Sequence, residues 1–251
     1  MEKRNNILYG RKPLIDALSS DAKVDKILLQ KDNIGPEIAQ IKSLAANAGI
    51  SIQMVPREKI ERVVGSRPGK NIVHQGVVAF LSLIDYVSIE DIIHFAHERK
   101  EDPLFLILDG VTDVHNFGAI ARSAECFGVH GIIIPEGGSA QINPEAIKAS
   151  AGALTKLNVA REKSLLTAIK YLKASGINII GTDVRGAAPM KETNFNCPCA
   201  IVLGAEGSGI SAPVLKLIDE NFKIPMKGKT ESLNVSVSAG VILYHVLEAR
   251  S

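Results

Sequence analysis

Residues 224–244 read IPMKGKTESLNVSVSAGVILY, a pattern that predicts a strand end, a turn and a helix built around a ligand. The apolar segment 222–226 is typical of a short β-strand and leads into a Lys/Gly-rich turn. Ser232 offers a hydroxyl that can cap a helix, and residues 233–247 carry apolar side chains at helical spacing. Four small residues occupy the first turns of this helix: Ser236, Ser238, Ala239 and Gly240. Because small residues and free N–H groups let a flat ligand come close, we expect the tail to form the floor of a ligand site.

The composition is that of an ordinary globular protein with room for one large domain or two small ones. The chain has 251 residues, of which 46% are hydrophobic and 22% are charged. No apolar run approaches the ~20 residues that a membrane span needs, and the start MEKRNNILYG lacks a signal-peptide core. Cys126, Cys197 and Cys199 are odd in number and do not suggest a disulfide framework. We therefore expect a cytoplasmic protein with no membrane partner.

The net charge is only +2, but the charge is unevenly distributed. Residues 1–84 hold 13 Lys or Arg against 8 Asp or Glu, whereas residues 85–251 hold 16 against 19. Five basic residues crowd one segment: Arg57, Lys59, Arg62, Arg67 and Lys70. Because Gly65, Pro68 and Gly69 lie in the same segment, we expect a basic loop of the kind found in nucleic-acid-binding proteins. A solvated charged face is an equally good interpretation of these residues.

The first third of the chain is expected to be a compact α/β unit. The predicted elements are a helix at 9–18, a strand at 26–30, a helix at 36–48, a strand at 50–55 and a strand at 77–83. The polar amphipathic segment 88–100, closed by Asp102 and Pro103, is interpreted as the connector between two domains.

The remainder alternates strands and helices, as in a mostly parallel sheet covered on both faces. Strands are predicted at 104–108, 131–134, 178–182, 200–203 and 222–226, and helices at 119–127, 145–149, 165–174, 213–218 and 233–247. In such sheets the ligand crevice lies beyond the carboxyl ends of the strands. Three loops are expected there, namely those after Asp109, Leu203 and Ile224.

The first of these loops leads to the sequence NFGAIAR at residues 116–122. Asn116 is expected just before a helix whose inner side presents Arg122, so that an amide and a guanidinium face one pocket. Arginine offers a rigid fork of donors that suits phosphate oxygens. For two such residues alone, a helix-capping Asn followed by a surface Arg is the simpler alternative.

The second loop is rich in glycine and reads GAEGSG at residues 204–209. Its glycines permit tight turns and close approach of a ligand. The spacing fits neither the dinucleotide fingerprint G-x-G-x-x-G nor a P-loop, because no Lys-Ser/Thr pair follows. A nucleotide-dependent oxidoreductase is therefore disfavoured. Glu206 is expected either to contact a substrate or to hold the loop to a neighbouring N–H group.

Five motifs, taken in order, resemble those of the SpoU/TrmH family of RNA ribose 2′-O-methyltransferases. They are residues 116–122, 150–153 (SAGA), 204–209, 224–226 (IPM) and 232–236 (SLNVS). The first third, from LYGRKP at 8–13 to HQGVVA at 74–79, is similar to the small L30e-like RNA-binding domain carried by the ribosomal-RNA branch of the family. Five motifs in this order are less probable by chance than any single one of them.

The resemblance implies a fold that patterning alone does not indicate. It implies an L30e-like RNA-binding domain at 1–84, a linker at 85–102 and a SPOUT-type α/β trefoil-knot domain at 103–251, the knot being an exception to the rule that connections do not thread. S-adenosylmethionine would lie in the knot, and no metal would be required. The residues implied to contact this methyl donor are Leu203, Gly204, Gly209, Ile224, Met226, Leu233 and Asn234. The resemblance also implies a homodimer formed through the C-terminal domain.

The implied reaction is an in-line displacement, in which a ribose 2′-hydroxyl attacks the methyl carbon of a sulfonium. Arg122 matches the arginine to which the family assigns activation of the hydroxyl. Because arginine side chains stay protonated in proteins, donation to an adjacent RNA phosphate is as good an interpretation as a base role. Asn116 would orient Arg122 or the ribose. Glu206 would position the loop and the substrate, while Asn234 would fix the start of the tail helix and line the site.

The two-domain arrangement implies a guanosine of large-subunit 23S ribosomal RNA as substrate, with the basic segment 57–70 holding nearby backbone. Only 4% of the residues are aromatic and none is Trp, so few platforms are available for stacking bases. Three alternatives stay open: a transfer-RNA ribose methyltransferase, an adenosine-directed ribosomal-RNA methyltransferase of the antibiotic-resistance type, and a non-catalytic RNA-binding or assembly factor. No metal centre is expected, since Cys197-Pro-Cys199 lacks a second ligand pair.

Overall fold

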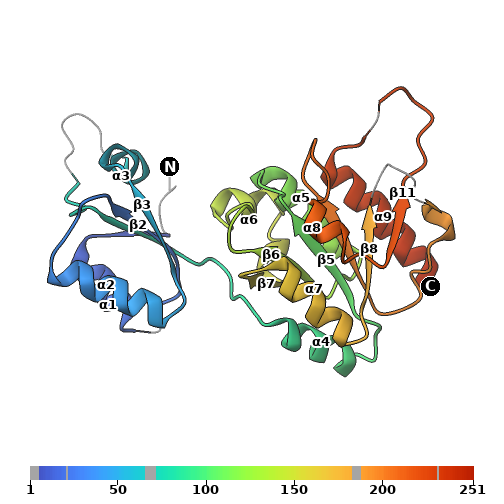
Figure 1. The fold of residues 1–251 in the computed structure, drawn as a ribbon, viewed down its shortest axis with the longest axis horizontal. Helices are drawn as coiled ribbons and strands as arrows, with labels where there is room; N and C mark the ends of the chain where they lie inside the picture. The colour runs from blue at the N-terminus through green and yellow to red at the C-terminus, as the bar shows by residue number, and fades with distance from the viewer. Residues whose placement is uncertain (1–5, 21, 66–71, 183–187, 231) are drawn as a thin grey trace. The chain divides into compact units, whose positions relative to one another are not determined.

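Two compact units make up the chain, and each has its own sheet and hydrophobic core (Figure 1). The structure is a computed structural model that describes residues 6–20, 22–65, 72–182, 188–230 and 232–251. The first unit comprises residues 1–83 and the second comprises residues 84–251. Among the helices of the described residues, none has the length and apolar character of a segment that crosses a bilayer.

The first unit is a four-stranded sheet with helices on both faces. Its strands are β1 (Ile7–Tyr9), β2 (Val24–Gln30), β3 (Ser51–Val55) and β4 (Val77–Leu81), in the order β1-β4-β2-β3. Its helices are α1 (Arg11–Leu18), α2 (Pro36–Asn47) and α3 (Arg57–Val64). Successive strand residues point to opposite faces, so Ile27 and Leu29 of β2 pack with α1 and α2, whereas Leu28 packs with α3.

The segment expected to be a basic loop begins instead with a helix, α3. Ile60 and Val64 are one helical turn apart and are both buried, which places the basic side chains of this segment on the exposed faces. Gly65 ends the helix with φ 68°, a conformation that glycine adopts without strain. Arg67 and Lys70 lie outside the described residues.

The second unit contains a seven-stranded sheet in which every described strand pair is parallel. In chain order its strands are β5 (Leu104–Asp109), β6 (Gly131–Pro135), β7 (Asn158–Glu162), β8 (Asn178–Thr182), β9 (Ala188–Pro189), β10 (Cys199–Gly204) and β11 (Glu220–Lys223). This arrangement confirms the predicted α/β class with a mostly parallel sheet. The sequence did not predict β7 or β9, because neither contains an apolar run.

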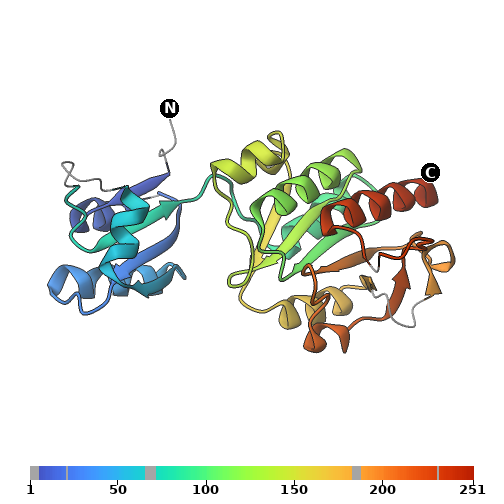
Figure 2. The same ribbon diagram turned by 90° about the horizontal axis from the view of Figure 1, so that it is seen from above.

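Helices cover both faces of the large sheet (Figure 2). They are α4 (Ile89–Glu98), α5 (Val114–Cys126), α6 (Pro144–Ala149), α7 (Leu165–Ala174), α8 (Ala212–Leu215) and α9 (Val235–Arg250). Helices α5, α6 and α9 pack on the face that carries Leu106, and α4, α7 and α8 pack on the face that carries Phe105. The segment 85–102, expected to be a connector, contains α4, whose residue Ile92 is fully buried in this second core.

The strand order brings the expected ligand loops to one edge of the sheet. The order is β7-β6-β5-β10-β8-β11-β9, so the chain moves outward from β5 to β7, returns to β8 and later inserts β10 between β5 and β8. Because the strands are parallel, the loops after β5, β8, β10 and β11 all emerge at the carboxyl ends of the strands. Ligands of open α/β sheets bind at such a reversal of strand order.

The end of helix α9 is tied to the sheet by Arg250. Its guanidinium donates hydrogen bonds to the carbonyl oxygens of Asp102, Phe195 and Cys197, at 2.7, 2.9 and 2.5 Å. We expect Arg250→Ala to lower the free energy of unfolding by about 2–4 kcal/mol, because it leaves three backbone acceptors without their partner. The exposed control Lys156→Ala should change it by less than about 0.5 kcal/mol. Urea denaturation measures both, and equal midpoints would contradict this role for Arg250.

Buried His130 links α4 to the sheet and makes the stability depend on pH. Its Nδ1 accepts a hydrogen bond from the Leu104 N–H at 3.0 Å, and its Nε2 lies 2.9 Å from Glu101 Oε2. Burial lowers the pKa of His130 below its ordinary value of 6.5, although Glu101 opposes this shift. The unfolded chain therefore binds more protons than the folded chain as the pH falls through 6.5, and stability is lost in that direction.

The pH dependence attributed to His130 can be isolated with His130→Asn, whose amide oxygen can still accept from Leu104 N–H. We expect the wild-type protein to lose more stability than this variant between about pH 7 and about pH 5.5. Urea denaturation at both pH values measures the difference. Parallel losses in the two proteins would show that His130 is not the group responsible.

Candidate functional site

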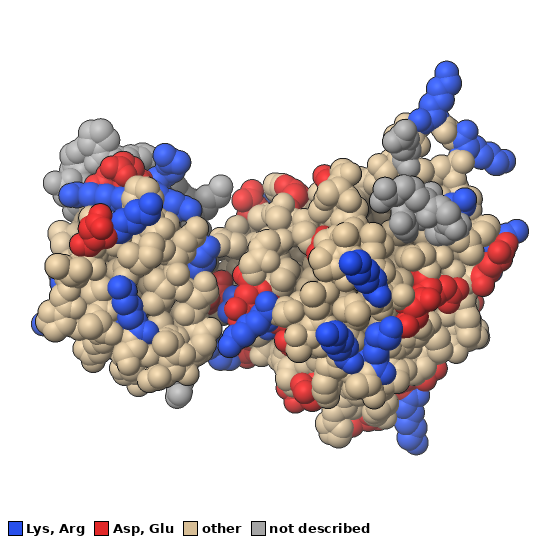
Figure 3. Space-filling view, in the orientation of Figure 1, with Lys and Arg blue, Asp and Glu red and all other residues tan. Residues whose placement is uncertain are grey.

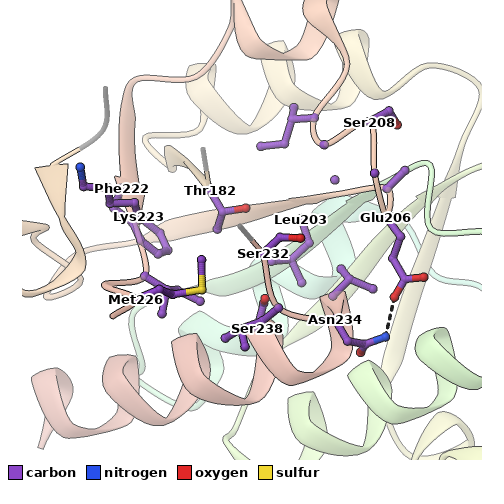
Figure 4. Close-up of a pocket in the computed structure, with 18 of the residues that line it drawn as sticks. Thr182, Leu203, Glu206, Ser208, Phe222, Lys223, Met226, Ser232, Asn234 and Ser238 are labelled. Atoms are coloured by element: carbon purple, nitrogen blue, oxygen red, sulfur yellow. Dashed lines mark hydrogen bonds between the residues drawn. The ribbon is translucent and has the colours of Figure 1, made fainter. Parts of the chain in front are cut away.

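A cavity of about 580 Å³ lies at the carboxyl ends of β8, β10 and β11 (Figure 4). Thr182 from the end of β8, Leu203 from β10 and Phe222 from β11 form one side of it. The tail between β11 and α9 forms the other side, as expected from the pattern of residues 224–244. All seven residues that the resemblance assigned to the methyl donor lie in its wall: Leu203, Gly204, Gly209, Ile224, Met226, Leu233 and Asn234.

The glycine-rich loop folds back tightly on the end of β10. Ala205 and Gly209 exchange backbone hydrogen bonds of 3.1 and 2.9 Å. A Cβ on Gly204 would lie closer than 3.0 Å to the backbone of Gly209 and Ile210, so only glycine fits there. The absence of a side chain at position 204 therefore lets the loop close on the end of β10, and residues 204–209 together line the cavity.

Asp109, at the end of β5, anchors the far side of this loop. Its Oδ2 accepts a hydrogen bond of 2.7 Å from the Ser211 N–H, just before α8. The sequence interpretation marked the loop after Asp109 but gave the carboxylate no role. The sequence signal that could have identified this role is a carboxylate at the last position of an otherwise apolar strand.

Helix α9 is capped by Asn234, and not by Ser232 as predicted. The Oδ1 of Asn234 accepts from the N–H groups of Ser236 and Val237, at 2.9 and 3.3 Å, and from the Ser236 hydroxyl at 2.6 Å. The helix therefore begins two residues later than expected, at Val235. Ser232 lies in the wall of the cavity instead.

The amide nitrogen of Asn234 connects the start of α9 to α5 and to the glycine-rich loop, which are distant from it in the sequence. Its Nδ2 donates to Asn116 Oδ1 on α5 at 2.9 Å and to Glu206 Oε1 in the glycine-rich loop at 2.5 Å. Figure 4 shows Glu206 and Asn234 pointing toward one another across this contact. Three of the four predicted catalytic residues thus form one polar cluster. Within the described residues, Asn116 Nδ2 and Glu206 Oε2 make no hydrogen bond, which leaves them available to a substrate.

Arg122, the fourth predicted catalytic residue, is not part of the cavity wall within a single chain. It lies six residues after Asn116 on α5, which turns its side chain by about 240° around the helix axis. Its side chain is exposed and makes no hydrogen bond or ion pair with the described residues. Within one chain, therefore, Arg122 does not join the Asn234 cluster, and α5 begins earlier than predicted, so that it includes Asn116.

Of the basic residues expected to bind RNA, Arg57, Lys59 and Arg62 lie exposed on α3 of the first unit. Arg57 pairs with Glu61 at 2.7 Å, and Figure 3 shows basic and acidic side chains interleaved in this region. The pKa of nearby Lys26 is lowered by burial and by the charge of Lys59. The pairing of Arg57 with Glu61 reduces the net positive charge of this surface.

Further lysines, which the sequence interpretation did not mark, lie beside the cavity of the second unit. Lys223 lines the cavity, and Lys227 and Lys229 are exposed on the tail between β11 and α9. Figure 3 shows basic side chains projecting from this tail. Lys223, Lys227 and Lys229 are spaced by four and two residues, which matches neither helical nor strand periodicity, so the sequence did not single them out as a group.

The described residues contain no group of three or more His, Cys, Asp or Glu side chains placed to hold a metal ion. Burial raises the pKa of the Cys199 thiol to about 11, so this group is protonated at neutral pH. The cavity itself is lined by polar side chains, such as those of Glu206 and Asn234, and by the glycines of the loop.

The second unit is thus an α/β domain of the ligand-binding class, with a cavity at the carboxyl ends of parallel strands and a hydrogen-bonded cluster of Asn116, Glu206 and Asn234 beside it. Comparison with known proteins identifies the family. Residues 103–244 match the SpoU rRNA Methylase family, and residues 7–87 match the RNA 2′-O ribose methyltransferase substrate-binding family. A TrmH family tRNA/rRNA methyltransferase of Bacillus subtilis is 36% identical over 100% of this chain and 98% of its own. The chain therefore belongs to the SpoU/TrmH family of RNA methyltransferases, which confirms the resemblance inferred from its motifs.

Solved structures share the fold over most of the chain. The AdoMet-bound rRNA methyltransferase of Sinorhizobium meliloti has a TM-score of 0.61 at 22% identity, covering 97% of this chain and 87% of its own. The SpoU methyltransferase AviRb of Streptomyces viridochromogenes, in complex with AdoMet, has a TM-score of 0.60 at 24% identity, covering 97% and 90%. The A. aeolicus TrmH/SpoU tRNA modifying enzyme has a TM-score of 0.55 at 28% identity, covering 64% and 83%.

Proposed function

We propose that this protein transfers the methyl group of S-adenosylmethionine to the ribose 2′-hydroxyl of a guanosine in 23S ribosomal RNA. The observation that carries the proposal is the Asn234 cluster, in which Asn234 joins Asn116 to Glu206 beside the cavity. Membership of the SpoU/TrmH family and the substrate-binding match of residues 7–87 support the reaction. Guanosine and 23S RNA rest on the resemblance of the two-domain arrangement to the ribosomal-RNA branch.

The cavity fits S-adenosylmethionine in size and character. Its volume of about 580 Å³ is within the ~300–1,000 Å³ typical of ligand pockets. Leu203, Ile224 and Leu233 offer apolar surface for a flat adenine, and the backbone near Gly204 offers hydrogen-bonding groups. When bound, the donor supplies an electrophilic methyl group on a sulfonium. AdoMet-bound relatives of the same fold support this assignment.

The residues of the chain would act mainly by orientation, which is worth up to ~7–11 kcal/mol in well-aligned systems. Asn234 holds Glu206 and Asn116 in fixed positions, and their free Oε2 and Nδ2 would orient the ribose. Arg122 is exposed and outside the cavity wall, and its role would be to bind an RNA phosphate of the substrate. Donation to phosphate also suits the planar fork of N–H donors that a guanidinium carries.

The homodimer would form on the exposed apolar stripe of α9. Val237 and Tyr244 are 51% and 55% exposed, and Val241 lies between them on the same face of the helix. Unpaired apolar stripes of this kind are typical of protein–protein interfaces. Sedimentation of Val241→Glu beside the wild type tests the dimer, and an unchanged mass would remove this face from it.

The remaining assignments follow from this function. Residues 1–84 would form the RNA-binding domain, in which Arg57, Lys59, Arg62, Arg67 and Lys70 contact RNA backbone. Residues 103–251 would form the catalytic domain, with its C-terminal segment threaded as a trefoil knot. Residues 85–102 would join the two.

Incorporation of labelled methyl from S-adenosylmethionine into protein-free 23S ribosomal RNA, beside bulk transfer RNA, tests the substrate. Label recovered as 2′-O-methylguanosine from ribosomal RNA alone is the expected result. Label in transfer RNA alone would leave the methyl transfer intact but overturn the substrate. Label as 2′-O-methyladenosine would favour the resistance type of enzyme.

Arg122→Lys tests the role of the guanidinium. Lysine keeps the positive charge but loses the planar fork, so we expect methyl transfer to fall by about tenfold to a hundredfold, with unchanged affinity for S-adenosylhomocysteine. The matched control Arg99→Lys changes an exposed arginine that pairs with Glu101 outside the cavity and should leave the rate unchanged. A full rate in Arg122→Lys would remove Arg122 from the mechanism.

A further inference from the structure

The first unit contains a cavity of its own, of about 630 Å³, which the proposed methyl transfer does not use. It is lined by the end of β2, the start of α3 and the turn before β4. The side chains that matter most for its chemistry are those of Arg11, Gln30, Arg57 and His74.

Both guanidinium groups in this cavity are already paired with carboxylates. Arg11 Nη1 lies 3.1 Å from Glu37 Oε2, and Arg11 Nη2 donates to Asn33 Oδ1 at 2.9 Å. Arg57 donates through Nε to Glu61 Oε1 at 2.7 Å. The pairing leaves little net charge to attract a phosphate, but it fixes two planar groups that retain further N–H donors.

His74 is a neutral donor in the wall of the cavity. It is only 6% exposed, and its Nδ1 accepts a hydrogen bond of 3.0 Å from the Gly76 N–H. Burial, aided by the charge of Arg57, lowers the pKa of His74. The neutral ring therefore carries its proton on Nε2, which makes no hydrogen bond with the described residues.

Gln30 adds an amide that can both donate and accept. Among the described residues its side chain has no hydrogen-bond partner. On the same cavity wall, Ile72 and Val73 provide apolar surface, and Val73 is 75% exposed. The cavity thus combines unpaired neutral hydrogen-bonding groups, fixed guanidinium planes and an apolar wall.

We propose that this cavity binds one unstacked nucleobase of the RNA substrate. The inference rests on the proposed function, which supplies RNA as the ligand. A base presents a flat face, which suits the apolar wall and a guanidinium plane, and a neutral edge of donors and acceptors, which suits Gln30 and His74. A guanine edge, with two adjacent acceptors, matches the excess of N–H donors from His74, Arg11 and Arg57.

Titration of the full-length ¹⁵N-labelled protein with guanosine 5′-monophosphate tests the site directly. The NMR signals of the Gly76 and His74 amides are expected to shift. Ribose 5-phosphate, which has the sugar and phosphate but no base, is expected to leave them unchanged. Equal shifts with both compounds would overturn base binding in favour of an anion site.

Two variants then test the site in RNA binding. His74→Asn keeps an oxygen that can accept the Gly76 N–H but removes Nε2–H, and Gln30→Ala removes the amide. Each is expected to weaken binding of 23S ribosomal RNA by about tenfold, and unchanged amide NMR signals of the first unit away from the cavity would show that this unit stays folded. The matched control Gln40→Ala, exposed on α2 outside the cavity, is expected to bind like the wild type.

Wild-type RNA affinity in both cavity variants would overturn the base site, even if methyl transfer to RNA is demonstrated. Conversely, the wild-type protein could fail to methylate any RNA while guanosine 5′-monophosphate still shifts the Gly76 signal. That result would contradict the proposed function and support the base site, so a failure of the base site can be distinguished from a failure of the proposed function.

Discussion

Gly204→Ala is expected to weaken binding of S-adenosylmethionine by at least ~100-fold and to reduce methyl transfer accordingly. The new Cβ would lie closer than 3.0 Å to backbone atoms of Gly209 and Ile210, which cannot rotate away as a side chain would. The glycine-rich loop must therefore move, and it is this loop that lines the cavity. Calorimetric titration with S-adenosylmethionine measures the loss.

The matched control for this substitution is Gly137→Ala. A Cβ at Gly137 meets no heavy atom within 4 Å, and its φ is not positive, so the added methyl group needs no rearrangement. We expect this variant to bind S-adenosylmethionine as the wild type does. Wild-type affinity in Gly204→Ala itself would show that the loop is not part of the methyl-donor site.

Asn234→Ser is expected to slow methyl transfer by about a hundredfold while changing the free energy of unfolding by less than about 1 kcal/mol. Serine is as good a helix cap as asparagine, so the start of α9 should persist. Its short side chain, however, carries no amide to donate to Asn116 and Glu206. The substitution thus separates the capping role of Asn234 from its bridging role. Single-turnover methyl transfer and urea denaturation measure the two effects.

Asn143→Ser is the matched control, because Asn143 caps α6 through a hydrogen bond of 2.8 Å from the Ala146 N–H. The same exchange of cap residue there should leave methyl transfer unchanged. If Asn234→Ser and Asn143→Ser are equally active, the bridge from Asn234 to Glu206 has no part in the reaction.

The sequence predicted the architecture of the second unit well because its central strands are apolar runs. β5 and β10 are almost completely buried, and continuous apolar runs of this length are typical of strands that are covered on both faces. β7 was missed because it is short and contains Asn158, Arg161 and Glu162, so its pairing with β6 is decided by the tertiary fold. In the first unit, residues 7–9 were missed as a strand because a run of three residues is too short to show a strand pattern, and the helix there begins at Arg11.

The candidate site was predicted in composition but not in detail. The motifs brought Asn116, Glu206 and Asn234 into one hypothesis, and the structure joins them by hydrogen bonds. The choice of cap between Ser232 and Asn234 could not be made, because both residue types are good caps and the choice depends on where the tail turns. The direction of Arg122 depended on the start of α5, and a helix boundary shifted by a few residues turns a side chain through a large angle.

The base cavity of the first unit had no sequence signal. Its walls come from separate segments between Arg11 and Gly76. Its features are the pairing of Arg11 and Arg57 with carboxylates and the proton position on His74. Such features depend on three-dimensional contacts between residues that are individually common.

Alkaline hydrolysis of RNA that the wild-type protein has labelled with methyl from S-adenosylmethionine tests the central claim most directly. Alkali cleaves RNA through attack of a free 2′-hydroxyl on the adjacent phosphate, so a 2′-O-methyl group protects its own linkage. The account predicts that the label is recovered in alkali-resistant dinucleotides. Label recovered in mononucleotides would mean that a base is methylated, and would contradict the assignment of this site to the ribose.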